Sequence, residues 1–186
     1  DFTSGNNIQM LQTGDEAYSQ MLDAINNAER SILLETYIFD RDAIGQKFAD
    51  ALEAAVKRGV EVRVLVDAVG ARYSIPSIVG LLKAKGFIVD VFNGNIIMGL
   101  RLPYANLRTH RKILIVDGRL GFMGGMNIRG AFVKAIAGDA VAFDTHFHIE
   151  GPAIADLFHV ASEDWRFAAG EPFTGEAWGI AAPKDP

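Results

Sequence analysis

The dipeptide Asp117-Gly118 separates two apolar segments, Ile113–Val116 and the run that begins at Leu120. Asp-Gly is the strongest local signal for a two-residue hairpin loop, because both residues of such a loop need positive φ angles. Four consecutive apolar residues before the loop are typical of a strand that is covered on both faces. The sequence therefore predicts a buried β-hairpin that turns at Asp117 and Gly118.

The predicted hairpin brings three polar side chains together. With a two-residue loop, His110 lies opposite Gly125, and Asn127 projects on the same side two residues later. Lys112 shares this face with His110, because alternate residues of a strand point the same way. The paired Gly124 and Gly125 are expected to leave open space beside the imidazole, so that a ligand can approach the backbone closely.

This combination of side chains suits chemistry on a phosphodiester. A neutral His can attack phosphorus or transfer a proton. Lys and Asn can donate hydrogen bonds to the non-bridging oxygens as negative charge builds up in the transition state. We therefore predict that His110, Lys112 and Asn127 are catalytic, and that this set needs no metal or other cofactor.

The motif His-x-Lys-x4-Asp-x6-Gly-Gly-x-Asn, which runs from His110 to Asn127, resembles the HKD signature of the phospholipase D superfamily. The segments Tyr37–Phe39 and Asp144–Pro152 are similar to the bacterial cardiolipin synthase branch of that superfamily. The resemblance extends from about Ile8 to Trp165. It implies a phospholipase D-like lobe of the α/β class, in which a layered mixed sheet is flanked by helices and carries a catalytic β-hairpin.

The order of predicted elements also favours the α/β class. Strands are predicted over 8–11, 31–39, 60–66, 87–92 and 143–149, and helices after Thr13, Asp42, Ser74 and Pro152. This alternation indicates a layered sheet with parallel crossovers. The catalytic lobe is predicted to span 1–167. The stretch 168–186 is rich in Gly, Pro and Ala without a periodic pattern, and is predicted to be a linker-like tail.

Further residues are assigned to the site. Asp144 is the candidate carboxylate that orients the catalytic imidazole, because a nucleophilic His needs an acceptor on its distal nitrogen. The resemblance also implies an acidic residue at about this distance after the motif. Asp117 in the turn and the pair Gly124 and Gly125 receive supporting roles. Arg108 is expected on the catalytic face, where it can bind a phosphate head group.

Two alternatives involve acidic and His residues. Asp144, His146 and His148 alternate and should face one way, and such spacing can also ligate zinc. A metal hydrolase is therefore a rival hypothesis, which insensitivity to chelators would exclude. Glu35 interrupts an apolar strand, where a carboxylate is costly unless it is paired. It belongs either to the active end of that strand or to a structural hydrogen bond.

Composition limits the classes of function. The 186-residue chain has a net charge of −5, which argues against a nucleic-acid-binding surface. It contains no cysteine, which excludes disulfides and thiolate chemistry. No apolar run approaches the length of a membrane span, so the visible chain is expected to be soluble by itself. The apolar segments 93–104 and 128–142 are expected either to meet acyl chains or a bilayer surface, or to pack against protein.

In the family that this chain resembles, two copies of the motif form one site. One His attacks phosphorus to give a covalent phosphohistidine, and the other protonates the leaving alcohol. One motif is present here, so the resemblance implies a second lobe in the same protein or a homodimer. We predict a cardiolipin synthase-like phosphatidyltransferase or phospholipase that acts on phospholipids and is associated with the bacterial inner membrane. The alternatives are a dimeric single-motif endonuclease and a non-catalytic lipid-binding or assembly lobe.

Overall fold

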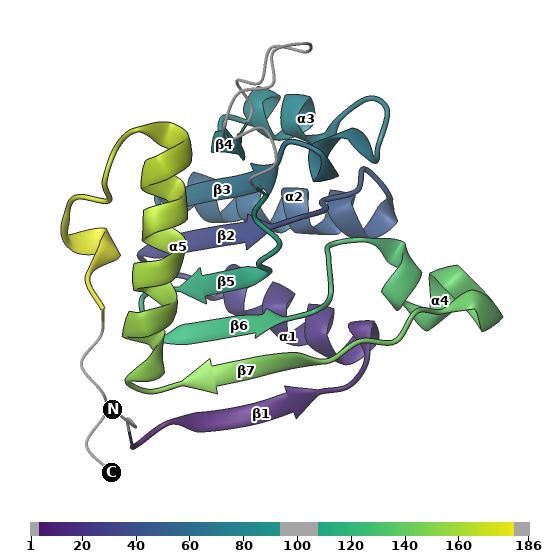
Figure 1. The fold of residues 1–186 in the computed structure, drawn as a ribbon, viewed down its shortest axis with the longest axis horizontal. Coiled ribbons are helices and arrows are strands. Elements are labelled where there is room, and N and C mark those ends of the chain that lie inside the picture. Colours follow the sequence, from purple (N-terminus) through teal and green to yellow (C-terminus); the bar gives the residue numbers. More distant parts are fainter. Residues whose placement is uncertain (1–3, 94–107, 181–186) are drawn as a thin grey trace.

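The computed structural model describes residues 4–93 and 108–180. Seven strands within these ranges form one mixed sheet with the order β1-β7-β6-β5-β2-β3-β4 (Figure 1). The strands are β1 (Asn7–Leu11), β2 (Ser31–Thr36), β3 (Glu61–Asp67), β4 (Ile88–Phe92), β5 (Ile113–Val116), β6 (Leu120–Gly124) and β7 (His146–Glu150). The parallel strands are β2, β3 and β4, and every other neighbouring pair is antiparallel. The predicted α/β class with a layered mixed sheet is confirmed.

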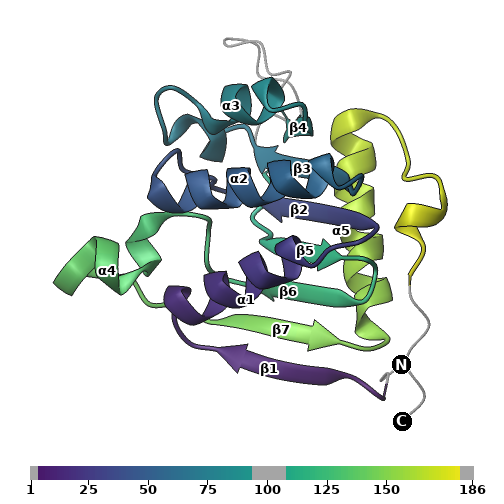
Figure 2. The ribbon, with the colours of Figure 1, turned by 180° about the vertical axis from the view of Figure 1, so that it is seen from behind.

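Helices cover both faces of the sheet. They are α1 (Gly14–Asn26), α2 (Ala43–Lys57), α3 (Ile78–Ala84), α4 (Lys134–Ala137) and α5 (Ala153–Ala169), with short 3₁₀ helices at Gly70–Arg72, Gly130–Phe132, Gly138–Ala140 and Glu176–Trp178. Figures 1 and 2 show α5 on one face of the sheet and α1 and α2 on the other. Within the described ranges, none of the helices combines the length and apolar composition that a bilayer-spanning helix needs.

The central strands are apolar on both sides because both sides are covered. In β2, Ile32 and Leu34 join the core beneath α1 and α2, whereas Leu33 packs on the α5 side. In β5, Ile113 and Ile115 likewise face α5. This alternation of two buried faces accounts for the unbroken apolar runs in the sequence.

Side chains at the predicted positions cap two helices. The Thr13 side chain accepts from the backbone N–H of Glu16 at 3.2 Å at the start of α1. The Asp42 carboxylate accepts from Ile44 and Gly45 at 3.0 and 2.9 Å at the start of α2. These bonds satisfy backbone donors that the first helical turn leaves unpaired. The Ser77 side chain caps a third helix, α3. This helix begins at Ile78, later than the start that was predicted after Ser74.

The first strand does not follow the parallel pattern that the order of elements suggests. β1 lies at the sheet edge opposite β4, where it pairs antiparallel with β7, the last strand. Ile8 lies opposite Ile149, for example. The two ends of the lobe therefore close the same edge of the sheet, a long-range pairing that the spacing of strands along the chain does not reveal.

The hairpin forms at the predicted position, but the predicted register is wrong by one residue. Asp117 and Gly118 have the expected positive φ angles of 55° and 63°. The loop includes Arg119 as a third residue, because Val116 pairs with Leu120. A three-residue hairpin loop is the next most common type after the two-residue loop. Pairing across the hairpin therefore cannot place Asn127 on the face of His110 and Lys112.

The predicted linker-like tail is wrong over its described part. Phe173 and Trp178 pack into the core on the α5 side of the sheet. The indole Nε1 of Trp178 donates to Oε2 of Glu61 at 2.8 Å, and the Ser31 hydroxyl donates to the carbonyl of Ala177 at 2.6 Å. This part of the tail completes the lobe, because it buries aromatic surface and bonds to the beginnings of β2 and β3. Residues 181–186 lie outside the described residues.

Candidate active site

Most residues of the motif lie at one end of the sheet, where β2 and β6 end and β5 and β7 begin. Glu35 of β2 pairs with Ile113 of β5, Ile113 pairs with Met123 of β6, and Met123 pairs with Phe147 of β7. The segments beyond this row carry His110 before β5, the two glycines at the end of β6, and Asp144 before β7. The fold therefore brings most of the predicted site residues to one end of the sheet.

Tyr37 links His110 and Lys112. Its ring centroid lies 4.8 Å from that of the exposed His110 imidazole, and the Lys112 Nζ lies 5.4 Å from the Tyr37 centroid. The same Nζ donates to the backbone carbonyl of His110 at 2.7 Å. Lys112 thus contacts both the aromatic face and the residue that carries the imidazole. Tyr37 follows β2, and sequence reasoning gave it no role in the site.

The Lys112 ammonium lies in a buried environment, with 5% of the residue exposed. Burial lowers the pKa of Lys112 to about 8, while the charges of Asp144 and Asp67, and that of Glu35 when it is ionised, act in the opposite direction. A buried cation interacts more strongly with an anionic ligand than an exposed one does, because the surroundings screen its charge less. Lys112 is therefore suited to bind an anionic oxygen below about pH 8.

The prediction that Gly124 and Gly125 leave open space beside the imidazole of His110 is wrong. A Cβ on Gly125 would lie 2.1 Å from Oδ1 of Asp144. A Cβ on Gly124 would lie 2.3 Å from the Thr145 carbonyl oxygen and 2.7 Å from Nδ1 of His146. The missing side chains make room for the 144–146 segment, because the pairing of β6 with β7 presses that segment against β6.

Asp144 lies beside Gly125, and its charge acts on both Lys112 and His146. Its Oδ1 accepts from the backbone N–H of Thr145 at 2.7 Å. Asp144 is thus close to the cation of the motif and well placed to hold negative charge there. Its predicted role in orienting His110 stays a prediction.

His146, which the sequence offers as a candidate zinc ligand, is a buried imidazole. Among the described residues, neither of its ring nitrogens has a hydrogen-bond partner. Burial lowers the pKa of His146 to about 4, and the Lys112 charge adds to this effect while Asp144 opposes it. A buried imidazole with two unpaired nitrogens therefore lies within range of the charge of the candidate catalytic cation.

The zinc alternative needs Asp144, His146 and His148 to converge. His148 instead stacks on Phe122, with ring centroids 4.8 Å apart, and its Nε2 lies 3.5 Å from a carboxylate oxygen of Glu150. In the part of the chain that the structure describes, no three His, Cys, Asp or Glu side chains are arranged to hold a metal ion. The three side chains that the zinc alternative requires therefore do not converge in the described part of the chain.

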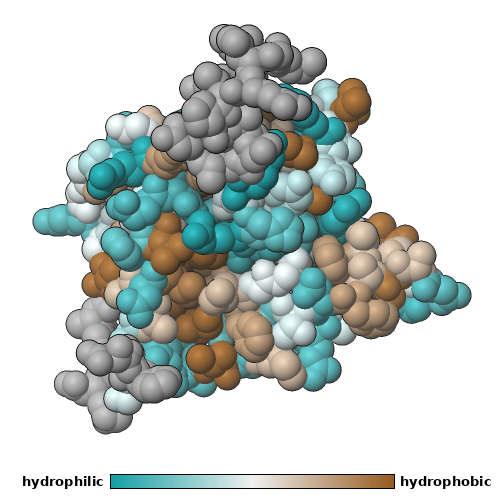
Figure 3. All heavy atoms as spheres, viewed as in Figure 1, coloured by the Kyte–Doolittle hydropathy of each residue, from teal (hydrophilic) through white to brown (hydrophobic). Residues whose placement is uncertain are grey.

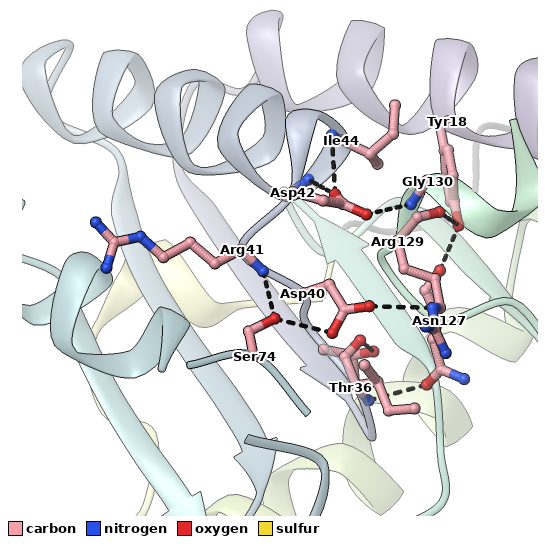
Figure 4. A network of polar contacts seen from close by, with 12 residues as sticks. Tyr18, Thr36, Asp40, Arg41, Asp42, Ile44, Ser74, Asn127, Arg129 and Gly130 are labelled. Carbon is pink, nitrogen blue, oxygen red and sulfur yellow. Dashed lines mark hydrogen bonds and ion pairs between the residues drawn. The ribbon is translucent and has the colours of Figure 1, made fainter. Parts of the chain in front are cut away.

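Asn127 reaches the site by another route than hairpin pairing (Figure 4). Its Oδ1 accepts from the backbone N–H of Ile38, next to Tyr37, at 2.9 Å. Its backbone carbonyl accepts from the hydroxyl of Tyr18, whose pKa is raised by burial. Because the amide oxygen is occupied by a donor, the amide nitrogen is the atom left to donate to a ligand.

The segment that follows Asn127 is fixed to the start of α2. Asp40 forms an ion pair with Arg129 at 3.0 Å and accepts from the Ser74 hydroxyl at 3.0 Å (Figure 4). Asp42, which caps α2, also accepts from the backbone N–H of Gly130. These carboxylates hold the segments that follow Tyr37 and Asn127 in one arrangement.

Two predicted residues lie at the margins of this site. Asp117 is at the far end of the hairpin, where its carboxylate accepts from the backbone N–H groups of Glu29, Arg30 and Ser31. It therefore ties the turn to the start of β2 and does not approach the other motif residues. Arg108 is the first described residue of its segment, and its contact with a head group stays a prediction.

Comparisons with known proteins show the family of this chain. Residues 21–155 match the family model of the cardiolipin synthase, phospholipase D-like domain. Cardiolipin synthase of Clostridium perfringens (strain 13 / Type A) is 38% identical over 168 residues, which cover 90% of this chain and 35% of that protein. Cardiolipin synthase B of Salmonella typhimurium is 35% identical over 161 residues, which cover 86% of this chain and 38% of that protein.

The fold is also found in solved structures. The phospholipase D family member Nuc from Salmonella typhimurium superposes with a TM-score of 0.66 at 20% identity, over 91% of this chain and 99% of that chain. The chain belongs to the phospholipase D-like domain family of cardiolipin synthases. It spans about a third of the length of the curated relatives that it matches.

Proposed function

We propose that this chain supplies one lobe of an enzyme that breaks a phospholipid phosphodiester bond through a covalent phosphohistidine. The observation that carries the proposal is the contact of His110 and Lys112 around Tyr37, an exposed imidazole next to a buried ammonium. An exposed nucleophile can reach a lipid head group, and a buried cation can stabilise the charge that develops on phosphorus oxygens.

In the proposed reaction, a ring nitrogen of His110 attacks phosphorus, and the bond from phosphorus to the leaving alcohol breaks. A second His, outside this lobe, gives its proton to the leaving oxygen, because one imidazole cannot be nucleophile and acid in the same step. The same second His then deprotonates water or an alcohol, whose oxygen attacks phosphorus and releases His110. Water gives hydrolysis, and an alcohol such as the glycerol of a second phospholipid gives transfer.

Lys112 and Asn127 bind the non-bridging oxygens in this mechanism. The ammonium of Lys112 donates from its buried position, and the amide nitrogen of Asn127 donates because its oxygen is held by Ile38. Asp144 orients the imidazole of the nucleophile or of its partner, and Arg108 contacts the head group. No cofactor takes part in these steps.

The second His comes from another motif-bearing lobe. We favour a lobe within the same protein, because the curated cardiolipin synthases are about three times as long as the segment that matches this chain. The alternative is a pair of identical chains that acts as a phosphodiesterase or endonuclease. Its support is the 99% coverage of the Nuc chain, since one lobe of this kind accounts for a whole solved chain.

A membrane surface is the proposed partner of the segment after Asn127. Figure 3 shows hydrophobic surface gathered over α4 and its surroundings. Ile136 in α4 is 50% exposed, and Phe143, directly before Asp144, is 78% exposed. Exposed apolar side chains beside a site for lipid head groups suit contact with a bilayer. The other predicted apolar segment, 93–104, lies almost wholly outside the described residues.

Vesicle binding tests this contact. Phe143→Ser should weaken binding of the whole protein to phosphatidylglycerol vesicles, because it removes apolar area that would leave water. Ile88→Ser on β4 removes a half-exposed apolar side chain elsewhere and serves as the matched control. Equal binding by both variants and the unchanged protein would contradict membrane contact at this segment.

Two assays on the whole protein test the reaction. One measures head-group release and exchange on phosphatidylglycerol, and the other measures DNA cleavage. His110→Ala should abolish phospholipid turnover, whereas His159→Ala, which changes an exposed His on α5, should leave it unchanged. DNA cleavage without lipid turnover would favour the endonuclease. Full lipid turnover by His110→Ala would contradict the proposal, and a lobe that binds lipid without any turnover would be the non-catalytic alternative.

A further inference from the structure

The residue before His110 is held by carboxyl groups on two neighbouring strands. The backbone N–H of the buried Thr109 donates to Oδ2 of Asp67, at the end of β3, at 3.1 Å. The hydroxyl of Thr109 donates to Oε1 of Glu35, near the end of β2. Glu35 and Asp67 are both fully buried. The position of His110 along the chain therefore depends on two carboxyl groups inside the sheet.

The second oxygen of Glu35 lacks a donor. Its Oε2 is buried and has no hydrogen-bond partner among the described residues. The carboxylate of Asp164, on α5, is near enough to share a hydrogen bond with Glu35 and also forms an ion pair with Arg111, the residue after His110. Two ionised carboxylates in contact repel each other, whereas one proton between them makes a strong hydrogen bond.

We propose that Glu35 is a positioning residue that stays protonated: it accepts from Thr109, donates to Asp164 and thereby fixes both neighbours of His110. In this arrangement every oxygen of the pair has a partner, and Asp164 keeps its charge for Arg111. The inference rests on the proposed function, since the position of His110 matters for catalysis only if His110 is the nucleophile. Glu35 itself does not touch the substrate.

The titration of Glu35 agrees with this role. Burial raises its pKa from 4.5 to about 8; the hydrogen bond from Thr109 and the charge of Arg111 lower it, and the charge of Asp164 adds to the rise. The other charged group that acts on this carboxyl is Lys112. Because the pKa of Glu35 is higher in the folded state than in the unfolded state, protonation of Glu35 stabilises the fold. This contribution is fully present below pH 4.5 and is lost as the pH rises towards about 8.

Infrared difference spectra between the whole protein and its Glu35→Gln variant test the protonation. We expect the carbonyl band of a protonated carboxylic acid at neutral pH, which disappears as the pH rises through about 8. Thr109→Val removes a bond that lowers the pKa, so the band should persist to higher pH in that background. Absence of the band at neutral pH, or an unchanged midpoint in Thr109→Val, would overturn the proposal.

Turnover of phosphatidylglycerol tests the positioning. An amide can accept from Thr109 and donate to Asp164, so Glu35→Gln should keep kcat within roughly twofold. Glu35→Ala should lower kcat about 100-fold with little change in KM, because the nucleophile is displaced. If the Ala variant does not fold, Thr109→Val should show a loss of about tenfold. A Gln variant as impaired as the Ala variant would show that the ionised carboxylate is needed.

The rate at high pH cannot replace the infrared measurement, because Lys112 titrates in the same range. The infrared band also separates this inference from the proposed function. Full activity of His110→Ala would contradict the proposed function whatever the band shows. A missing band with an inactive His110→Ala variant would overturn the role of Glu35 alone.

Discussion

The buried polar groups near the two ends of the β5–β6 hairpin differ in whether they have hydrogen-bond partners. At the turn, the Asp117 carboxylate accepts from three backbone N–H groups between 2.7 and 3.2 Å. At the other end, both ring nitrogens of His146 and one oxygen of Glu35 are buried without hydrogen-bond partners among the described residues. Buried polar groups without partners are rare in folded proteins and mark places where a proton or a ligand completes the set.

This difference separates stability from function within a single hairpin. Substitutions at the turn should weaken folding and spare activity. Substitutions of the ligand-facing groups at the open end should remove activity and spare folding, because those groups are arranged for a ligand and contribute little to the stability of the lobe. Four substitutions or conditions, taken from the largest expected effect to the smallest, test this contrast.

The strongest test is Lys112→Met. It replaces a buried ammonium by an apolar side chain of similar length, so kcat for phospholipid turnover should fall about 1,000-fold, as when a group that stabilises transition-state charge is lost. The thermal midpoint of unfolding should stay unchanged or rise, because a desolvated charge is removed. A large fall in stability would mean that Lys112 belongs with the structural end.

Gly125→Ala tests the space that Asp144 occupies. The new Cβ would lie 2.1 Å from Oδ1 of Asp144, so the carboxylate must move from its present position. We expect a loss in kcat of about 100-fold from this displacement. The matched control is Gly80→Ala in α3, where a Cβ meets nothing within 4 Å. The control should keep full activity and gain about 0.5–1 kcal/mol in unfolding free energy.

Asp117→Ala should have the opposite signature. It leaves the N–H groups of Glu29, Arg30 and Ser31 without their acceptor, and the free energy of unfolding should fall by about 3 kcal/mol. Chemical denaturation of the whole protein measures this loss, and kcat below the unfolding range should stay within about twofold of the unchanged protein. A lost activity with unchanged stability would place Asp117 in the catalytic set.

The pH dependence gives the smallest effect near neutrality. Burial lowers the pKa of Lys112 to about 8, so its ammonium is present below that pH and is lost as the pH rises through it. Phospholipid turnover should fall about tenfold per pH unit above this point. Lys112→Arg should extend the active range to higher pH, because a guanidinium stays charged. The same alkaline limb in both proteins would assign the titration to another group.

Much of the fold could be predicted because its signals are local. The turn at Asp117-Gly118, the caps at Thr13 and Asp42, and the apolar strands each depend on a few neighbouring residues. The loop length depends on distant contacts instead. Asp117 bonds to 29–31, and a Cβ on Gly118 would lie 2.5 Å from the carbonyl oxygen of Gly179, so the turn is shaped by segments far away in the sequence.

The site was predictable where spacing within one segment decides it. His110 and Lys112 lie together because they are two residues apart. The place of Asn127 depends on its bond to Ile38, and the purpose of the glycine pair depends on β7, which joins the sheet some twenty residues later. Tyr37 belongs to a segment that is similar to the cardiolipin synthase branch. The sequence does not reveal that its ring lies against the imidazole of His110.

The sequence of the tail contains aromatic residues that indicate packing. Phe173 and Trp178 are large apolar residues in a stretch of Gly, Pro and Ala; Trp178 is buried in the core on the α5 side of the sheet, and the partly buried Phe173 packs against it. Aromatic residues bury more area than other side chains, so two of them close together indicate packing even without periodicity. A composition typical of linkers does not exclude such contacts.

The most direct test of the central claim is mass spectrometry of the whole protein, quenched rapidly during turnover of a phospholipid and digested. We predict a phosphatidyl group on His110, absent from His110→Ala and present in His159→Ala. The same adduct should form with different head groups, because the leaving alcohol has departed at that stage. Turnover with no adduct on His110, or with the adduct on another residue of this lobe, would contradict the account.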